Sequence, residues 1–220
     1  MCRSRNYILK KYRANYHDKK ILEQLIVHHS ITPYLVKNYK KNKSNVAFVF
    51  SCPGRDELIA GIPCSGTTGK NLDKLLKILN VINSDIFCNT NRYKYDILNA
   101  TEVVHFEMLD NKTEGKKDEI DDGIKKILKY IIFNKNLSYI ILFGEKAVNA
   151  MEPLNDFIKN NKRKIIVLDA NYHLGFKSLN RIHYDINNNP IDKNNYSKSY
   201  ERTNARLKVV ADIIIKQLNK

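Results

Sequence analysis

The segment from Ser51 to Gly69 concentrates residue types that can do chemistry. Its sequence, SCPGRDELIAGIPCSGTTG, combines an acidic pair, two cysteines and a cluster of glycine, serine and threonine. An apolar run, VAFVF, precedes it, and a leucine-rich run follows it. A strand that delivers a loop to the start of a helix commonly presents backbone N–H groups to an anionic or phosphorylated ligand. The segment is therefore the first candidate for a ligand site.

The sequence GTTGKN at 66–71 has the composition of a phosphate-binding P-loop but not its spacing. With Gly69 and Lys70 as the G-K pair, the pattern G-x-x-x-x-G-K-[ST] needs a glycine at Cys64 and a hydroxyl residue at Asn71. A P-loop also follows its strand directly, whereas about a dozen residues intervene here. We therefore do not expect an NTPase.

Two later segments also end an apolar run with polar residues. Asn99 lies at the end of YDILNA, and His173 lies in DANYHLGFKSLN, which follows the apolar run IIVL. In parallel sheets, ligands bind beyond the carboxyl ends of the strands. We therefore expect the loops after Phe50, Leu98 and Leu168 to converge on one edge of a sheet.

Apolar runs and helical periodicities predict the frame that positions these loops. Strands are predicted at 45–51, 95–100, 138–143 and 165–168, and helices at 71–79, from Gly144, at 117–133 and at 203–218. Strands that read as continuous apolar runs and alternate with helices are typical of a parallel sheet covered on both faces. We predict an α/β fold, with three α/β/α layers around a central, mostly parallel four-stranded sheet. Residues 1–220 are predicted to form a single domain, with a basic helical extension over 1–44 and an irregular excursion over 183–202.

The charge of the chain indicates a polyanionic partner. The 38 Lys and Arg residues outnumber the 23 Asp and Glu residues, which gives a formal net charge of +15 and a pI near 9.5. Such an excess favours nucleic acid over an anionic membrane or an acidic protein. Lysines that only solvate the surface are the alternative explanation.

Cysteine spacing and hydropathy exclude several other classes. The four cysteines form no CxxC pair and no Cys/His ligand spacing, so we expect no metal, no iron–sulfur cluster and no other cofactor. No apolar run approaches the roughly 20 residues of a membrane span. We expect a monomeric, cytoplasmic, nucleoid-associated protein that does not bind membranes.

The pattern SCPGRDELIAGIPCSGTTGKNLDKLL resembles the first motif of the uracil-DNA glycosylase superfamily, and is closest to the branch that carries an iron–sulfur cluster. Aligned without gaps, Ser51 falls at the family's glutamate and Cys52 at its alanine. The matching positions are Pro53, Gly54, the acidic pair Asp56 and Glu57, Gly61, Pro63, Gly66, Gly69, Leu72 and Asp73.

Three later segments extend this resemblance over roughly residues 45–180. YDILNAT is similar to the strand that ends in the family's base-reading asparagine, which implies that role for Asn99. ILFGEKAV is similar to its strand–glycine–helix segment, and DANYHLGFKSLNR resembles its second motif, which implies His173 as the motif's histidine. The resemblance implies the glycosylase fold and excision of a base from DNA.

The same residues are chemically suited to cleaving an N-glycosidic bond. Such an enzyme needs a donor at the departing base and a group that positions water on the other face of the sugar. His173 can donate to the base, and Asn99 can donate and accept along its Watson–Crick edge. Asp56 or Glu57 can hold the water or stabilise the sugar cation, and a solvated acidic pair is the alternative.

The remaining candidates are expected to contact the base or the DNA backbone. Cys52, Cys64 and Glu57 are predicted to contact the base, and Gly54, Ser65, Gly66, Thr67, Lys177 and Ser178 to contact phosphates. Leu174 or Phe176 is predicted to wedge into the gap left in the duplex, and ordinary core packing is the alternative for both.

Three departures from the family pattern affect the predicted activity. Ser51 replaces a carboxylate, and a serine can orient water but cannot act as its base at neutral pH without help. Cys64 replaces an aromatic residue, which removes a stacking platform and leaves space. His173 is followed by Leu174 and Gly175 instead of proline and serine. Apart from these three, the cluster cysteines are also missing.

These departures leave two functions open, and the charge of the chain weighs against a third. We favour a glycosylase whose roomier pocket takes a modified pyrimidine, such as a hydroxymethylated or glucosylated base, in defence against modified phage DNA. The alternative is a catalytically inactive module that binds DNA and recognises a flipped base. A hydrolase of free nucleosides fits less well, because a small substrate needs neither the charge of +15 nor the basic, aromatic arm at 3–20.

Overall fold

The structure is a computed structural model that describes residues 35, 37–40, 44–106, 117–160 and 164–220. The two helices predicted within residues 1–44 lie outside the described residues. Residues 37–40 run beside the sheet, where Tyr39 and Ile97 exchange two backbone hydrogen bonds of 2.7 and 2.9 Å. These bonds cover an edge strand that would otherwise present unpaired backbone groups.

The core of the molecule is a four-stranded sheet in which every pairing is parallel. Its strands are β1 (Val46–Phe50), β2 (Asp96–Asn99), β3 (Tyr139–Leu142) and β4 (Ile166–Asp169), in the order β2-β1-β3-β4. Phe50 pairs with Asn99 in the last register position of β1 and β2. The predicted four-stranded α/β fold is thus confirmed, and β1 lies between β2 and β3.

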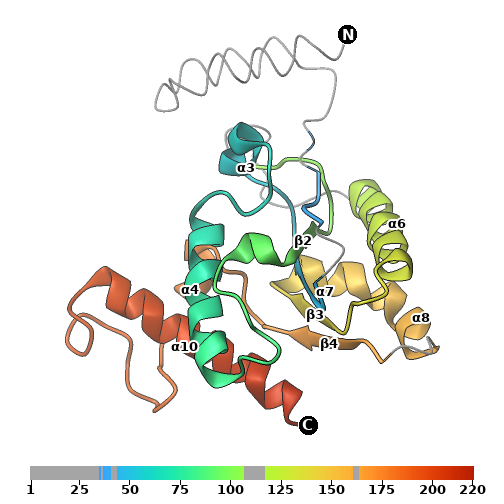
Figure 1. Cartoon of the computed structure of the whole chain (residues 1–220). Coiled ribbons are helices and arrows are strands. Elements are labelled where there is room, and N and C mark those ends of the chain that lie inside the picture. Colours follow the sequence, from blue (N-terminus) through green and yellow to red (C-terminus); the bar gives the residue numbers. More distant parts are fainter. Residues whose placement is uncertain (1–34, 36, 41–43, 107–116, 161–163) are drawn as a thin grey trace, which may run out of the picture.

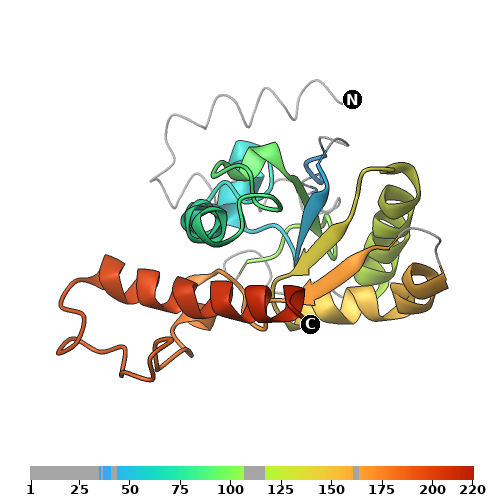
Figure 2. The same ribbon diagram turned by 60° about the horizontal axis from the view of Figure 1, so that its bottom comes forward.

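Helices cover both faces of the sheet. On one face lie α4 (Thr67–Ile82) and α10 (Ser199–Leu218), and on the other lie α6 (Lys117–Phe133), α7 (Glu145–Met151), η3 (Glu152–Leu154) and α8 (Asn155–Asn160) (Figures 1 and 2). Three short elements accompany the loops: α3 (Arg55–Ala60), η2 (Arg92–Lys94) and α9 (Phe176–Leu179). The arrangement is the three-layer α/β/α architecture that the alternating pattern predicts.

Alternation along β1 explains why both faces are apolar. Phe48 and Phe50 pack with the leucines of α4, whereas Ala47 and Val49 pack with α6 and α7. Successive strand side chains point to opposite faces, so a strand buried on both sides must be apolar throughout. The sheet is therefore a rigid base from which the loops at its carboxyl edge project.

Helix boundaries differ from the predictions mainly at helix starts. The helix predicted from about residue 71 begins at Thr67, and the one predicted from Thr203 begins at Ser199. Both first turns are polar, so the apolar periodicity used for the predictions could not reveal them. The short helix α3 was also missed, because its six residues are too few for a periodic signal.

The irregular excursion predicted at 183–202 is shorter than expected. It ends where α10 begins at Ser199, and it is built from side-chain-capped turns in which Asp185 and Asp192 accept backbone N–H groups. Among the helices that the structure describes, none is long and apolar enough to cross a membrane.

Candidate functional site

A hollow of about 170 Å³ opens at the carboxyl ends of β1 and β2, and we call it the strand-end hollow. It is lined by residues of four separate segments: Phe50, Ser51, Cys52, Pro53, Gly54, Glu57, Cys64, Thr68, Asn99, His105 and His173. The three loops predicted to converge on one edge of the sheet therefore do meet there. Seven of the predicted site residues line this hollow: Ser51, Cys52, Gly54, Glu57, Cys64, Asn99 and His173.

Backbone pairing continues past the strand ends and holds two of these segments together. The N–H of Ala100 donates to the carbonyl of Phe50 (2.7 Å), and the N–H of His105 donates to the carbonyl of Pro53 (3.0 Å). The loop after β2 consequently runs beside the loop after β1. This pairing carries His105, which is only 4% exposed, into the wall of the hollow.

His173 is fixed as a neutral hydrogen-bond donor. Its Nδ1 accepts the backbone N–H of Gly175 (2.9 Å), so the proton of the neutral ring is on Nε2. Its own backbone N–H donates to Ser178 Oγ (3.0 Å), and its ring meets Phe50 edge-on at 5.7 Å between centroids. Burial lowers the pKa of His173 to about 4, so the ring is uncharged at neutral pH.

The glycine two residues after His173 is required by this geometry. A Cβ atom at Gly175 would lie 2.9 Å from His173 Nδ1, closer than side-chain atoms tolerate. The family's proline–serine pair is absent here, and Gly175 instead brings a backbone N–H to the ring. Ser178 therefore holds the loop that carries His173, because its Oγ accepts the backbone N–H of that histidine.

Asn99 presents an unsatisfied amide at the end of β2. The residue is 3% exposed, and its backbone N–H donates to Asn38 Oδ1 (2.9 Å). Its side-chain Nδ2 is buried and has no hydrogen-bond partner among the described residues. A buried donor that forms no hydrogen bond lowers stability by about 1–3 kcal/mol. A buried amide without a partner in the wall of a hollow is the arrangement expected where a ligand supplies the acceptor.

His105 pairs with an acidic residue that the sequence analysis did not connect to the site. Its Nε2 lies 2.6 Å from Glu119 Oε2 on α6. Gly123, one turn further along α6, allows this contact, because a Cβ there would lie 1.6 Å from the carbonyl oxygen of Ala100. The helix therefore approaches the loop after β2 closely enough for Glu119 to reach the histidine. The acidic first turn of the predicted helix 117–133 was the only sequence signal for this pair.

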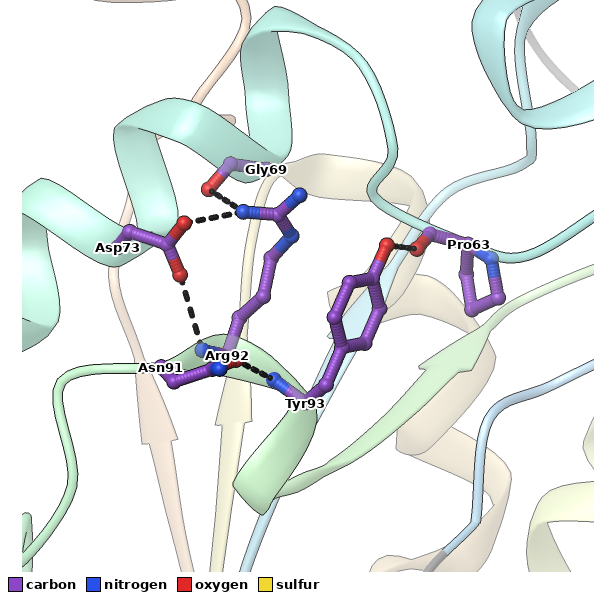
Figure 3. Close-up of polar contacts among 6 residues, drawn as sticks. All are labelled: Pro63, Gly69, Asp73, Asn91, Arg92 and Tyr93. Carbon is purple, nitrogen blue, oxygen red and sulfur yellow. Dashed lines mark hydrogen bonds and ion pairs between the residues drawn. The ribbon is translucent and has the colours of Figure 1, made fainter. Parts of the chain in front are cut away.

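A polar clamp holds the loop between α3 and α4 (Figure 3). Arg92 of η2 forms an ion pair with Asp73 of α4 and donates to the carbonyl of Gly69 (3.4 Å). Its guanidinium lies 4.6 Å from the ring centroid of Tyr93, whose hydroxyl donates to the carbonyl of Pro63 (3.0 Å). The clamp fixes the residues on either side of Cys64.

The two cysteines and the serine of the hollow are uncharged groups. Cys64 is 4% exposed, and burial, followed by the nearby Glu57 carboxylate, raises the pKa of its thiol. Ser51 Oγ lies 3.8 Å from Cys52 Sγ, to which it donates. Ser51 and Cys64 therefore offer small, neutral surfaces to a ligand.

Only one residue of the acidic pair of the first motif lines the strand-end hollow. Glu57 lines the strand-end hollow and accepts the backbone N–H of Gly54 (3.1 Å), which caps the start of α3. Asp56 lies instead against Gly66, in a second hollow of about 230 Å³ that we call the helix-start hollow, and it pairs with Arg55 at 3.8 Å. The structure does not bring Asp56 into the wall that His173 and Asn99 share.

Three of the six predicted phosphate contacts, Ser65, Gly66 and Thr67, lie at the start of α4. Gly66 and Thr67 line the helix-start hollow, and Ser65 Oγ is buried without a partner in the part of the chain that is described. Lys177 is exposed on α9, near the same edge of the molecule.

Of the two predicted wedge residues, the structure keeps only one. Leu174 is fully buried in the core that α4 and α10 form with the sheet, and its carbonyl accepts Asn71 Nδ2 (2.9 Å). The prediction that Leu174 inserts into DNA is therefore wrong, and core packing is its role. Phe176 is 63% exposed and remains available.

The strand-end hollow can hydrogen-bond a flat polar ligand from two sides. It combines a neutral imidazole donor, an unsatisfied amide and a histidine–carboxylate pair. Within the described ranges, no group of three or more His, Cys, Asp or Glu residues is placed to hold a metal ion. No protein-family model matches the chain, and no curated protein matches its sequence.

Proposed function

We propose that the chain is a DNA glycosylase that hydrolyses the N-glycosidic bond of a flipped, modified pyrimidine and leaves an abasic site. The observation that carries the proposal is the buried Nδ2 of Asn99, which has no hydrogen-bond partner among the described residues. Asn99 lines the same hollow as the neutral His173. A site built to hydrogen-bond the edge of an extruded base needs such an amide. A site that only held the strands together would instead satisfy it.

The proposed chemistry separates the two sides of the sugar. When the C1′–N bond breaks, its electron pair moves onto the departing base, and positive charge develops on the sugar. His173 donates from Nε2 to the base oxygen on which negative charge gathers, while Asn99 holds the base edge. Because the imidazole starts neutral, its hydrogen bond strengthens as the base becomes an anion.

The His105–Glu119 pair is the proposed water side. The attacking water adds its oxygen to C1′ and must lose a proton, and a histidine held by a carboxylate stabilises the positive charge that this proton brings. Ser51 orients the water in this scheme. Glu57 is engaged in capping α3, which makes it less suited to proton transfer.

Small residues at two positions support a modified base as the substrate. Ser51 and Cys64 stand where the resembling family has a carboxylate and an aromatic ring, and both line the hollow. Shorter side chains leave room for a substituent on the pyrimidine. The net charge of +15 supports DNA as the polymer that carries the base, and defence against phage DNA with such bases is the proposed setting.

An incision assay tests the activity directly. The protein is incubated with DNAs that carry uracil, hydroxymethylated or glucosylated pyrimidines, and alkali then breaks the strand at abasic sites. We expect breaks at a modified base and no release of base from free nucleosides. Breaks on none of these substrates, with DNA binding retained, would leave the inactive DNA-binding module as the function.

A pair of asparagine variants tests the carrying observation. Asn99→Ala removes an amide that has no partner, so we expect loss of cleavage with little change in the free energy of unfolding. The matched control is Asn134→Ala, since Asn134 Nδ2 lies 2.7 Å from Tyr130 Oη and 3.2 Å from Asp96 Oδ2. This control should lower stability and leave cleavage by the folded fraction unchanged. A strongly destabilised Asn99→Ala protein would show that the amide serves the fold.

A further inference from the structure

A third hollow, of about 470 Å³, lies between the start of α4, α9 and the first turns of α10, and we call it the α4–α10 hollow. It is the largest of the three hollows described here. Thr67, Lys74, Phe176, Asn180, Tyr200 and Arg206 are among the residues that line it. The sequence predicts roles for Thr67 and Phe176, as a phosphate contact and a duplex wedge, but for none of the other four residues.

The charge of the α4–α10 hollow is uniformly positive. Lys74 and Arg206 line it, and none of the described residues that line it carries a carboxylate. Arg206 is anchored by its Nε, which donates to the carbonyl of Ile182 (3.2 Å), and burial together with the neighbouring Arg202 lowers its pKa. A second cation therefore lies near Arg206, and an anionic ligand would reduce the repulsion between the two.

The helix-start hollow next to it differs in charge. Asp56 and Glu57 line that hollow together with Arg55. Two carboxylates repel a phosphate, whereas the α4–α10 hollow presents only cations. The wider hollow is therefore the better place for the backbone of a nucleic acid.

Two exposed aromatic rings accompany these cations. Phe176 is 63% exposed and Tyr200 is 53% exposed. Single exposed rings are common, but two rings that share a hollow with a lysine and an arginine match the pattern of single-strand binding sites. In such sites the bases stack on the rings and the cations follow the phosphates.

The three hollows form one continuous path along the start of α4. Glu57 and Thr68 line both the strand-end and the helix-start hollows, and Thr67 and Phe176 line both the helix-start and the α4–α10 hollows. Thr68 and Lys74 are six residues apart on α4, or about 9 Å along its axis. Successive phosphates of one strand are only about 3.4 Å apart along the axis of B-DNA. Adjacent nucleotides that occupy the strand-end and α4–α10 hollows must therefore be stretched apart and unstacked.

We propose that the α4–α10 hollow binds a second, unstacked nucleotide of the same DNA strand, with its base on Tyr200 and Phe176 and its phosphate at Lys74 and Arg206. The inference rests on the proposed function, because the first nucleotide occupies the strand-end hollow. Its consequence is a preference for single-stranded or melted DNA, since two nucleotides must leave the stack.

Binding of short single-stranded oligonucleotides tests the inference. Tyr200→Ala should weaken binding about tenfold, as expected for the loss of one base–aromatic stack. Arg206→Gln should weaken it as well and reduce its salt dependence. The matched controls are Tyr184→Ala, which removes a tyrosine that is 56% exposed elsewhere, and Lys208→Gln, on an exposed face of α10. Both controls should bind within about twofold of the wild type.

Cross-linking of the unaltered protein gives a second measurement that does not depend on a variant's folding. A 5-iododeoxyuridine placed one or two nucleotides from the target base should cross-link to a peptide containing Tyr200 or Phe176. The wild type should also cleave single-stranded DNA faster than the same sequence in a duplex.

The outcomes separate this inference from the proposed function. Cleavage that persists while Tyr200→Ala and Arg206→Gln behave like their controls would overturn the second site and leave the glycosylase standing. Cross-links confined to other peptides would do the same. A wild-type protein that binds no DNA would overturn both.

Discussion

Two histidines line the strand-end hollow, and their surroundings are opposite. His173 receives a backbone N–H on Nδ1, and burial lowers its pKa to about 4. His105 faces the Glu119 carboxylate at 2.6 Å, on the side of the hollow that α6 covers. The first ring is buried and neutral, and the second ring is hydrogen-bonded to a carboxylate.

The difference shows how one side-chain type can perform two roles in one hollow. Desolvation and a backbone donor both disfavour the charged form of His173, which suits a donor that must keep its proton. A carboxylate partner orients an imidazole and favours the charged form that follows proton uptake. The roles are set by neighbours, Gly175 in one case and Glu119 in the other, and the comparison can therefore be broken at either neighbour.

Removal of His173 should have the largest effect. We expect His173→Ala to lower the rate of base excision about 10²–10³-fold, the usual cost of losing one donor to a developing anion. The rate is measured in single-turnover incision with enzyme in excess, which excludes effects on product release. His183→Ala, at an exposed histidine of the excursion, is the matched control and should cleave at the wild-type rate. A folded His173→Ala protein as fast as wild type would remove His173 from the mechanism.

The next effect in size is the pH dependence of stability that the burial of His173 should cause. Burial holds the native pKa of His173 at about 4, below its ordinary value of 6.5, so protonation favours the unfolded chain. The stabilisation is present above pH 6.5 and is lost as pH falls from there towards 4. Its limit is about 3 kcal/mol, at 1.36 kcal/mol for each pKa unit.

Urea unfolding at pH 7.5 and pH 4.5 measures this effect. The comparison protein is His173→Gln, which keeps a polar side chain but does not titrate. We expect the wild type to lose more stability than His173→Gln between the two pH values. Equal losses would mean that the histidine is hydrated and free to protonate in the native protein.

Removal of the Glu119 carboxylate should have a smaller effect on the rate of base excision. Glu119→Gln keeps the shape of the side chain but removes the charge that stabilises protonated His105, and we expect about a tenfold loss of rate. Asp118→Asn removes an exposed charge one residue earlier on α6 and should change the rate by less than twofold.

A double variant distinguishes a positioning role of Glu119 from a purely structural one. If Glu119 acts through His105, Glu119→Gln should lower the rate little further in a His105→Ala background. An equal fractional loss of rate in both backgrounds would assign Glu119 to packing alone.

The sequence predicted the first histidine but not the second, for a physical reason. Asn99 lies at the end of an apolar run and His173 in the loop that follows another, and the carboxyl ends of parallel strands meet at one edge. His105 reaches the hollow only because backbone pairing continues beyond the strands, and Glu119 reaches it because Gly123 lets α6 approach. Both are tertiary contacts that leave no periodic signal in the chain.

The misassigned residues have an equally local cause. Leu174 and Phe176 are both apolar and both follow His173, so composition could not tell which one faces the solvent. The structure buries Leu174 under α4, where Asn71 binds its carbonyl, and turns Phe176 outward at the start of α9. Asp56 and Glu57 are likewise adjacent in sequence and both line the helix-start hollow, but only Glu57 also reaches the strand-end hollow.

The smallest expected effect concerns Cys64, which lines the strand-end hollow together with both histidines. Cys64→Phe should shift the ratio of cleavage rates towards uracil about fivefold, because a ring there restores a stacking surface and fills the space for a substituent. The shape of the profile of cleavage rate against pH should not change, since neither histidine loses its partner. Cys64→Ala keeps the space and is the matched control for any strain at this residue, whose φ is 53°. If Cys64→Phe slows all substrates equally, the room beside Cys64 does not select the base. If it alters the pH profile, the histidines and the base-selecting wall are not independent, and the division of roles fails at that point.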